Sequence, residues 1–109
     1  MPEEIKSVED FNSFIRAKGV VIIHFWAEWN RLDNEMKEIL KELEFEFGRK
    51  VKFYSLDVDQ PHLFDLLRNL RLSGVTALAY FKDGNKIALE VSLKNKEYVQ
   101  NKINQLLNS

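Results

Sequence analysis

The side chains in this sequence that could do chemistry at neutral pH are few, and none of them is a thiol. The chain contains no cysteine, which excludes thiolate nucleophiles, disulfides and Cys-ligated metal centres. Its two histidines, His24 and His62, lie far apart, and no third ligand follows at a matching spacing. We therefore expect neither a metal site nor a cofactor.

An amide and a carboxylate lie where an apolar run gives way to a helical pattern. Residues 25–33 read FWAEWNRLD, and Asp33 falls in the first turn of the expected helix. A carboxylate there is favoured by the free N–H groups and by the helix dipole. We interpret Asp33 first as a structural residue at a helix start.

The predicted elements around these residues alternate between strands and helices. The continuous β-branched and aromatic run at 20–26 is typical of a strand buried on both faces, and residues 51–58 form a second predicted strand. An Asp-Gly pair between two further apolar runs predicts a hairpin. The helical period predicts helices that start after Ser7, near Asp33, after Pro61 and after Asn95.

The predicted order is β-α-β-α-β-α-β-β-α, in which only the first strand, near Ile5, is left open. This order predicts an α/β protein with three layers, α/β/α, and a mixed central sheet. We expect parallel strands joined by helical crossovers and an antiparallel hairpin at one edge. The 109 residues suit one domain, 1–109.

Composition and charge indicate which classes of partner to exclude and which location to expect. A net charge of −1 supplies no basic field for nucleic acid or for anionic membranes. The acidic start MPEEIKSVED does not have the pattern of a secretory signal, and no apolar run approaches the roughly 20 residues of a membrane span. We expect a cytoplasmic protein that binds neither nucleic acid nor membrane.

Four short stretches, in order along the chain, resemble the thioredoxin family. They are FWAEW at 25–29, DVDQ at 57–60, GVTA at 74–77 and FKDGN at 81–85. The resemblance implies a thioredoxin fold over nearly the whole chain. It says less about activity, because one fold hosts many functions.

The family's redox motif Trp-Cys-Gly-Pro-Cys corresponds to Trp29-Asn30-Arg31-Leu32-Asp33. Thiol–disulfide exchange needs an attacking thiolate and a resolving thiol, and Asn30 and Asp33 can replace neither. We therefore expect no thiol–disulfide oxidoreductase and assign no catalytic residue. Asn30, Arg31, Leu32 and Asp33 are degenerate motif positions.

Other family positions are altered as well. The resemblance places the family's buried aspartate at His24, its lysine neighbour at Ser55 and its cis-proline at Thr76. Since a cis bond before a non-proline residue costs about 3–4 kcal/mol, we predict a trans Val75–Thr76 peptide. The proline that kinks the family's second helix falls at Glu38, so we expect that helix to run straighter.

The same resemblance implies that His24 and Asp33 face each other as a buried polar pair. An imidazole beside a carboxylate would be hydrogen-bonded and held partly charged. We favour a structural role for the pair. The alternative is an acid–base pair, which requires His24 to reach solvent below a cleft.

The groove that holds a partner's extended segment in the family would here be lined by larger side chains. We predict partner-binding residues in three loops: Trp29, Arg31, Leu32, Val75, Thr76 and Leu93. Tryptophan, arginine and apolar anchors dominate protein interfaces. An exposed Phe45 would be a second candidate contact.

These patterns favour a redox-inactive, thioredoxin-like module that binds a protein partner, or another copy of itself, through the former active-site groove. Two alternatives stay open. One is a non-redox acid–base enzyme that uses His24 and Asp33. The other is a chaperone-like holdase that binds many unfolded chains weakly in the same groove.

Overall fold

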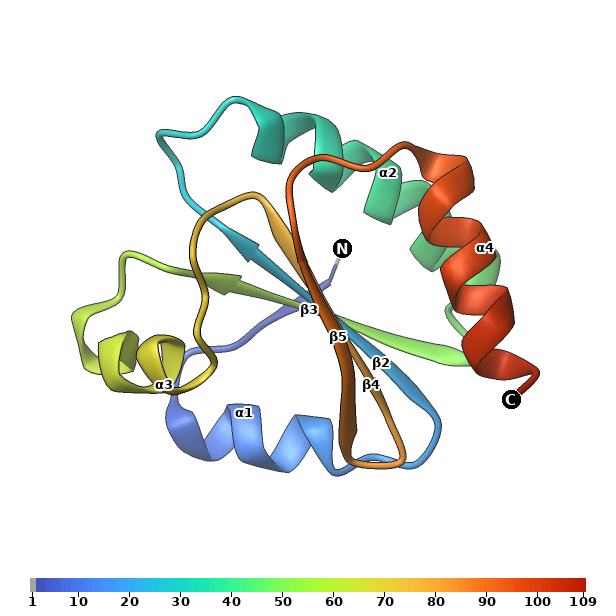
Figure 1. The fold of residues 1–109 in the computed structure, drawn as a ribbon, viewed down its shortest axis with the longest axis horizontal. Coiled ribbons are helices and arrows are strands. Elements are labelled where there is room, and N and C mark those ends of the chain that lie inside the picture. The colour runs from blue at the N-terminus through green and yellow to red at the C-terminus, as the bar shows by residue number, and fades with distance from the viewer. Residues whose placement is uncertain (1) are drawn as a thin grey trace.

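A computed structural model describes residues 2–109, and it shows five strands in one sheet with helices on both faces (Figure 1). The strands are β1 (Glu3–Glu4), β2 (Val20–Trp26), β3 (Val51–Asp57), β4 (Ala77–Lys82) and β5 (Asn85–Val91). The helices are α1 (Val8–Ile15), α2 (Leu32–Phe47), the 3₁₀ turn η1 (Pro61–Leu63), α3 (Phe64–Asn69) and α4 (Lys96–Leu107). The sequence-based order is confirmed, and the doubtful first strand is a two-residue β1.

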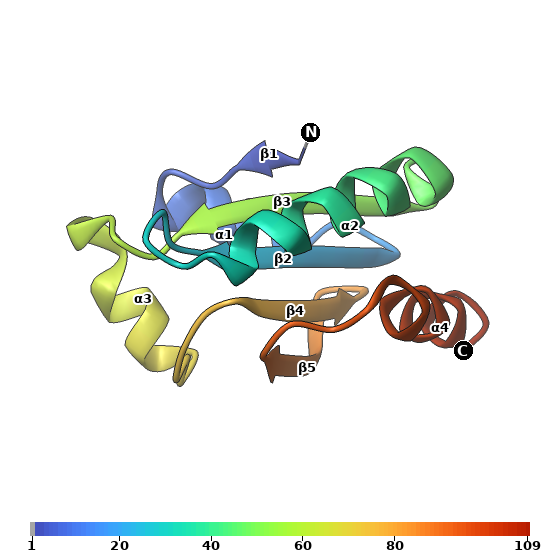
Figure 2. The ribbon, with the colours of Figure 1, turned by 90° about the horizontal axis from the view of Figure 1, so that it is seen from above.

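The sheet is mixed, with the order β1-β3-β2-β4-β5, so β1 and β5 form its edges (Figure 2). β1, β3 and β2 run parallel. β4 runs antiparallel to both β2 and β5, so the antiparallel part of the sheet is larger than the hairpin that the sequence predicted. β2 lies at the centre between β3 and β4, which explains why its residues 20–25 are all buried.

Side chains alternate across β2 and divide the core between the two faces of the sheet. Val20 and Ile22 pack with α2 and α4, and Val21 and Ile23 pack toward α1 and α3. Figure 1 shows the same two layers, with α2 and α4 on one side of the strands and α1 and α3 on the other. His24 follows Val20 and Ile22 in this alternation, so its side chain lies on the α2 side.

Local signals fix the ends of the elements. The Ser7 hydroxyl accepts a hydrogen bond from the Asp10 amide at 3.0 Å, and the Asn95 side chain caps α4 through the Tyr98 amide at 2.8 Å. The hairpin turns at Asp83 and Gly84, whose positive φ angles of 52° and 86° suit a two-residue turn. None of the helices in residues 2–109 is long and apolar enough to cross a membrane.

α2 carries a fully buried and a highly exposed apolar side chain two positions apart. It is one continuous helix of 16 residues that passes through Glu38 without a break. Leu43 is fully buried, whereas Phe45, two positions later, is 94% exposed. These two residues form a matched pair for testing how α2 packs on the sheet.

We predict that Leu43→Ala lowers the free energy of unfolding by about 2–5 kcal/mol, because it leaves a cavity in the core. Phe45→Ala changes it by less than about 0.5 kcal/mol, because that ring contacts mainly solvent. Urea unfolding followed by circular dichroism measures both. Equal losses for the two variants would show that α2 packs on a different face.

Candidate functional site

The site occupies the junction between the end of β2 and the start of α2, and Asn30 organises its backbone. The Asn30 side-chain oxygen accepts a hydrogen bond from the Leu32 amide at 3.0 Å, and its main-chain carbonyl accepts one from the Asp33 amide at 3.2 Å. Asn30 therefore satisfies two of the free N–H groups at the start of α2, as a capping residue does.

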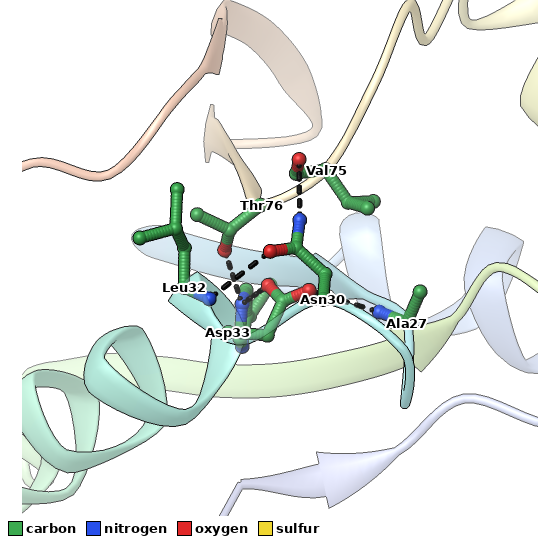
Figure 3. A network of polar contacts seen from close by, with 7 residues as sticks. Ala27, Asn30, Leu32, Asp33, Val75 and Thr76 are labelled. Atoms are coloured by element: carbon green, nitrogen blue, oxygen red, sulfur yellow. Dashed lines mark hydrogen bonds and ion pairs between the residues drawn. The ribbon is translucent and has the colours of Figure 1, made fainter.

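The other side of the Asn30 amide reaches across to the loop before β4. Its nitrogen donates to the Val75 carbonyl at 2.6 Å, and Figure 3 shows this bond joining the two segments. A single side chain thus links the start of α2 to a loop more than forty residues away.

The Val75–Thr76 peptide bond is cis, so the prediction of a trans bond is wrong. That prediction considered only the local cost of the bond. Tertiary contacts hold this turn from three directions: Asn30 bonds the Val75 carbonyl, His24 bonds the Thr76 hydroxyl, and the Ser92 amide donates to the Thr76 carbonyl at 2.9 Å.

His24 and Asp33 meet in the core, as the resemblance implied. His24 Nε2 lies 2.9 Å from Asp33 Oδ1 and 2.7 Å from Thr76 Oγ1, and each of the three residues is at most 1% exposed. The second carboxylate oxygen of Asp33 accepts the Ala27 amide at 3.0 Å (Figure 3). Because a carboxylate oxygen accepts, we assign the ring hydrogen to Nε2.

The pKa of His24 shifts in the direction opposite to the one that the sequence-based expectation needs. Burial lowers the pKa of His24 below its usual 6.5, and this effect outweighs the hydrogen bond and the negative charge of Asp33, which both act to raise it. The positive charge of Lys37 lowers the pKa further. The direction of this shift disfavours the charged form of the ring, whereas the sequence-based expectation was a partly charged imidazole.

This geometry does not suit acid–base catalysis. That hypothesis required His24 to reach solvent, and the side chain is 1% exposed. Both of its hydrogen bonds use Nε2 and bind other buried side chains. The pair has the features of a structural connection among β2, α2 and the turn before β4.

The predicted partner-binding residues divide into an exposed and a covered group. Trp29 is 70% exposed, Leu32 is 44% exposed, and Arg31 is exposed beside them. Val75 and Leu93 are half-buried, and both also pack against the core. Thr76 is fully buried, so its side chain lies beneath the surface rather than on it.

The Trp29 indole is held in place although it is exposed. Its Nε1 donates to Asp59 Oδ2 at 2.9 Å, which ties the junction to the turn after β3. An exposed ring with a fixed orientation loses little conformational freedom when another protein covers it. We call Trp29, Arg31, Leu32 and Val75 the contact surface.

His62 lies apart from this site. Its Nε2 bonds the Lys6 carbonyl at 2.6 Å. Across residues 2–109, no group of three or more histidine and acidic side chains is placed to hold a metal ion.

Comparison with known proteins shows which family the chain belongs to. The sequence model of the thioredoxin family matches residues 3–105. The chain belongs to the thioredoxin family. A thioredoxin of Chlamydia pneumoniae is 35% identical over 102 residues, covering 94% of this chain and 96% of that protein. A thioredoxin of Bacillus subtilis is 29% identical and covers 94% of this chain and 97% of its own length.

Solved thioredoxin structures share the fold. The thioredoxin of Malassezia sympodialis superposes with a TM-score of 0.85 at 25% identity, over 97% of this chain and 90% of that one. A mutant thioredoxin from Halobacterium salinarum superposes with a TM-score of 0.88 at 19% identity, over 97% of this chain and 90% of that chain, which shows the fold alone. The absence of cysteine from this chain is compatible with a lack of thiol–disulfide activity.

Sequence reasoning named Asn30 and Thr76 but missed their roles, and it did not single out Asp59. Asn30 was treated as a lost cysteine position, although asparagine is a strong helix cap and that signal was available. The Thr76 hydroxyl lies against the same His24 nitrogen, Nε2, as Asp33, and the Asp59 carboxylate holds Trp29. The last two contacts join residues far apart in the chain and leave no local pattern in the sequence.

We predict that Asp33→Ala lowers the free energy of unfolding by about 2–4 kcal/mol, because the Ala27 amide and the His24 ring lose a buried acceptor. Asp65→Ala is the matched control, since Asp65 pairs with Arg68 at 2.8 Å with both side chains exposed. Asp65→Ala lowers the free energy of unfolding by less than about 1 kcal/mol. Chemical unfolding compares the two, and similar small losses would contradict a structural role for Asp33.

The lowered pKa of His24 predicts a loss of stability on acidification. Below pH 6.5 the unfolded chain binds a proton at His24 that the folded chain does not, so stability falls from pH 6.5 down to the folded pKa. This group contributes at most about 1.4 kcal/mol per pH unit. An NMR titration of the His24 ring that gave a pKa at or above 6.5 would contradict this prediction.

Proposed function

We propose that this chain is a redox-inactive thioredoxin-family protein that binds a protein partner through the contact surface. The observation that carries the proposal is the Trp29 indole, 70% exposed and fixed by Asp59 at 2.9 Å. Tryptophan and arginine are the residue types most enriched at the energetic centres of interfaces. Leu32 and Val75 add apolar area beside the ring.

The former motif positions support redox inactivity. Asn30 caps α2 and bonds the Val75 carbonyl, and Asp33 bonds His24 and Ala27. Neither side chain is a nucleophile that can attack a disulfide. The two positions hold the loops around the contact surface in place.

Redox inactivity predicts no catalysis of disulfide reduction. With dithiothreitol as the electron source, reduction of insulin by this chain proceeds at the rate of the buffer alone. A thioredoxin with both motif cysteines, assayed in parallel, accelerates it. Any acceleration above buffer by pure protein would contradict the proposal.

The acid–base alternative is not supported, since the His24 side chain is 1% exposed. The holdase alternative uses the same surface and differs in affinity and breadth. A partly apolar surface of a few side chains, with Trp29 fixed in one orientation, favours a defined partner over many unfolded chains. Self-association through the same side chains is a further form of the proposal.

Partner binding predicts that Trp29→Ala weakens the complex at least about tenfold, as expected for a central anchor. Partners are first captured from the cytosolic fraction of the source organism with the wild-type chain and with a Trp29→Ala, Val75→Asp variant, after circular dichroism shows that both fold. Binding constants are then measured with the purified partner. Phe45, 94% exposed, is the second candidate contact and lies outside the contact surface. The proposal predicts that Phe45→Ala leaves the affinity unchanged.

Three outcomes separate the proposals. Loss of binding in the Trp29 variant but not in the Phe45 variant supports the contact surface. Weak capture of many unrelated unfolded chains supports the holdase, and a wild-type dimer that dissociates in the Trp29 variant supports self-association. Equal capture by all variants contradicts all three uses of the surface.

A further inference from the structure

A second feature lies below α2, on the β1 side of the sheet and separate from the contact surface. It is a cavity of about 440 Å³, a volume within the range of small-molecule sites. His24, Trp26 and Ser55 contribute from the strands, and Leu40 contributes from α2. Exposed charged side chains surround the opening, with both signs represented equally: Glu4, Lys37, Glu38 and Lys41.

The His24 ring brings an acceptor to this cavity. Nε2 carries the ring hydrogen and makes both hydrogen bonds, to Asp33 and to Thr76. In a neutral imidazole the other nitrogen, Nδ1, then carries a lone pair. Nδ1 takes no part in either bond, so the ring, which lines the cavity, retains one acceptor that these two bonds do not use.

Trp26 and Ser55 add further polar groups next to this acceptor. Trp26 Nε1 is buried and has no hydrogen-bond partner among residues 2–109. The ammonium group of Lys37 lies 3.6 Å from the centroid of the same indole ring and so covers one of its faces. Ser55 is half-buried, and its short side chain ends in a hydroxyl that can donate or accept.

These features define the chemistry of a ligand. Apolar walls from Leu40 and the Trp26 ring favour an apolar body. The balanced charges at the opening give no preference for an anion or a cation. Nδ1 of His24 requires a donor. We propose that the cavity binds a small neutral molecule with an apolar body and a hydroxyl group that donates to Nδ1 of His24.

Phenol and anisole are the probes that test this proposal, because they share a ring and differ in the hydroxyl donor. Each is titrated into the ¹⁵N-labelled chain while the His24 ring nitrogens and the Trp26 indole N–H are followed by NMR. Phenol is expected to shift both residues saturably, and anisole to bind about fivefold more weakly, as the loss of one hydrogen bond implies.

Two variants locate the site. Ser55→Leu places a larger apolar side chain in the cavity beside His24 and is expected to abolish the phenol shifts. Ser13→Leu makes the same change at an exposed position on α1, on the opposite face of the sheet, and is expected to leave them intact. If Ser55→Leu does not fold, Ser55→Val replaces it, and its phenol affinity is expected to fall at least threefold.

Other outcomes overturn the proposal. Shifts that do not saturate mean that the cavity holds only water. Equal affinity for phenol and anisole means that His24 does not select a donor. Binding that survives substitution of Ser55 in a folded variant places the probe elsewhere on the protein.

Discussion

The hydrogen bond between His24 and Asp33 is the interaction on which the rest of this site depends. A carboxylate that is 1% exposed is stable only when its oxygens are bonded, and here one oxygen accepts from the ring and the other from the Ala27 amide. The imidazole also contacts Thr76, so one buried group connects β2, the first turn of α2 and the turn before β4.

That connection explains how a member of the thioredoxin family keeps its loops in place without its sulfur atoms. Asn30 and Asp33 occupy the two former cysteine positions, and each is bonded to a different neighbouring segment. Their polar groups are used inside the protein. What remains at the surface is the Trp29 ring with Arg31 and Leu32, and none of these side chains is a nucleophile that could attack a disulfide.

The fold was predictable because its signals are local and repeated. The apolar run at 20–26, the Asp-Gly hairpin and the caps Ser7 and Asn95 each appear in the structure where the sequence placed them. The pairing of His24 with Asp33 followed only from the family resemblance. The antiparallel pairing of β2 with β4 did not follow from the alternation of elements.

Three features of the site could not be predicted, for one physical reason. The cis Val75–Thr76 bond, the lowered pKa of His24 and the fixed Trp29 indole all depend on the tertiary structure around them. Local propensity gives the intrinsic cost of a conformation, and tertiary contacts decide whether it is adopted. For His24, burial sets the direction of the pKa shift.

A double-mutant cycle shows whether His24 and Asp33 act together in a buried network at the junction. His24→Leu, Asp33→Leu and the double variant are unfolded in urea, and their free energies of unfolding are compared with that of the wild type. We predict a coupling energy of about 1.5–3 kcal/mol, with the double variant more stable than the sum of the single losses implies. Losses that add within about 0.5 kcal/mol would show that the two residues act independently and that no such network connects the junction.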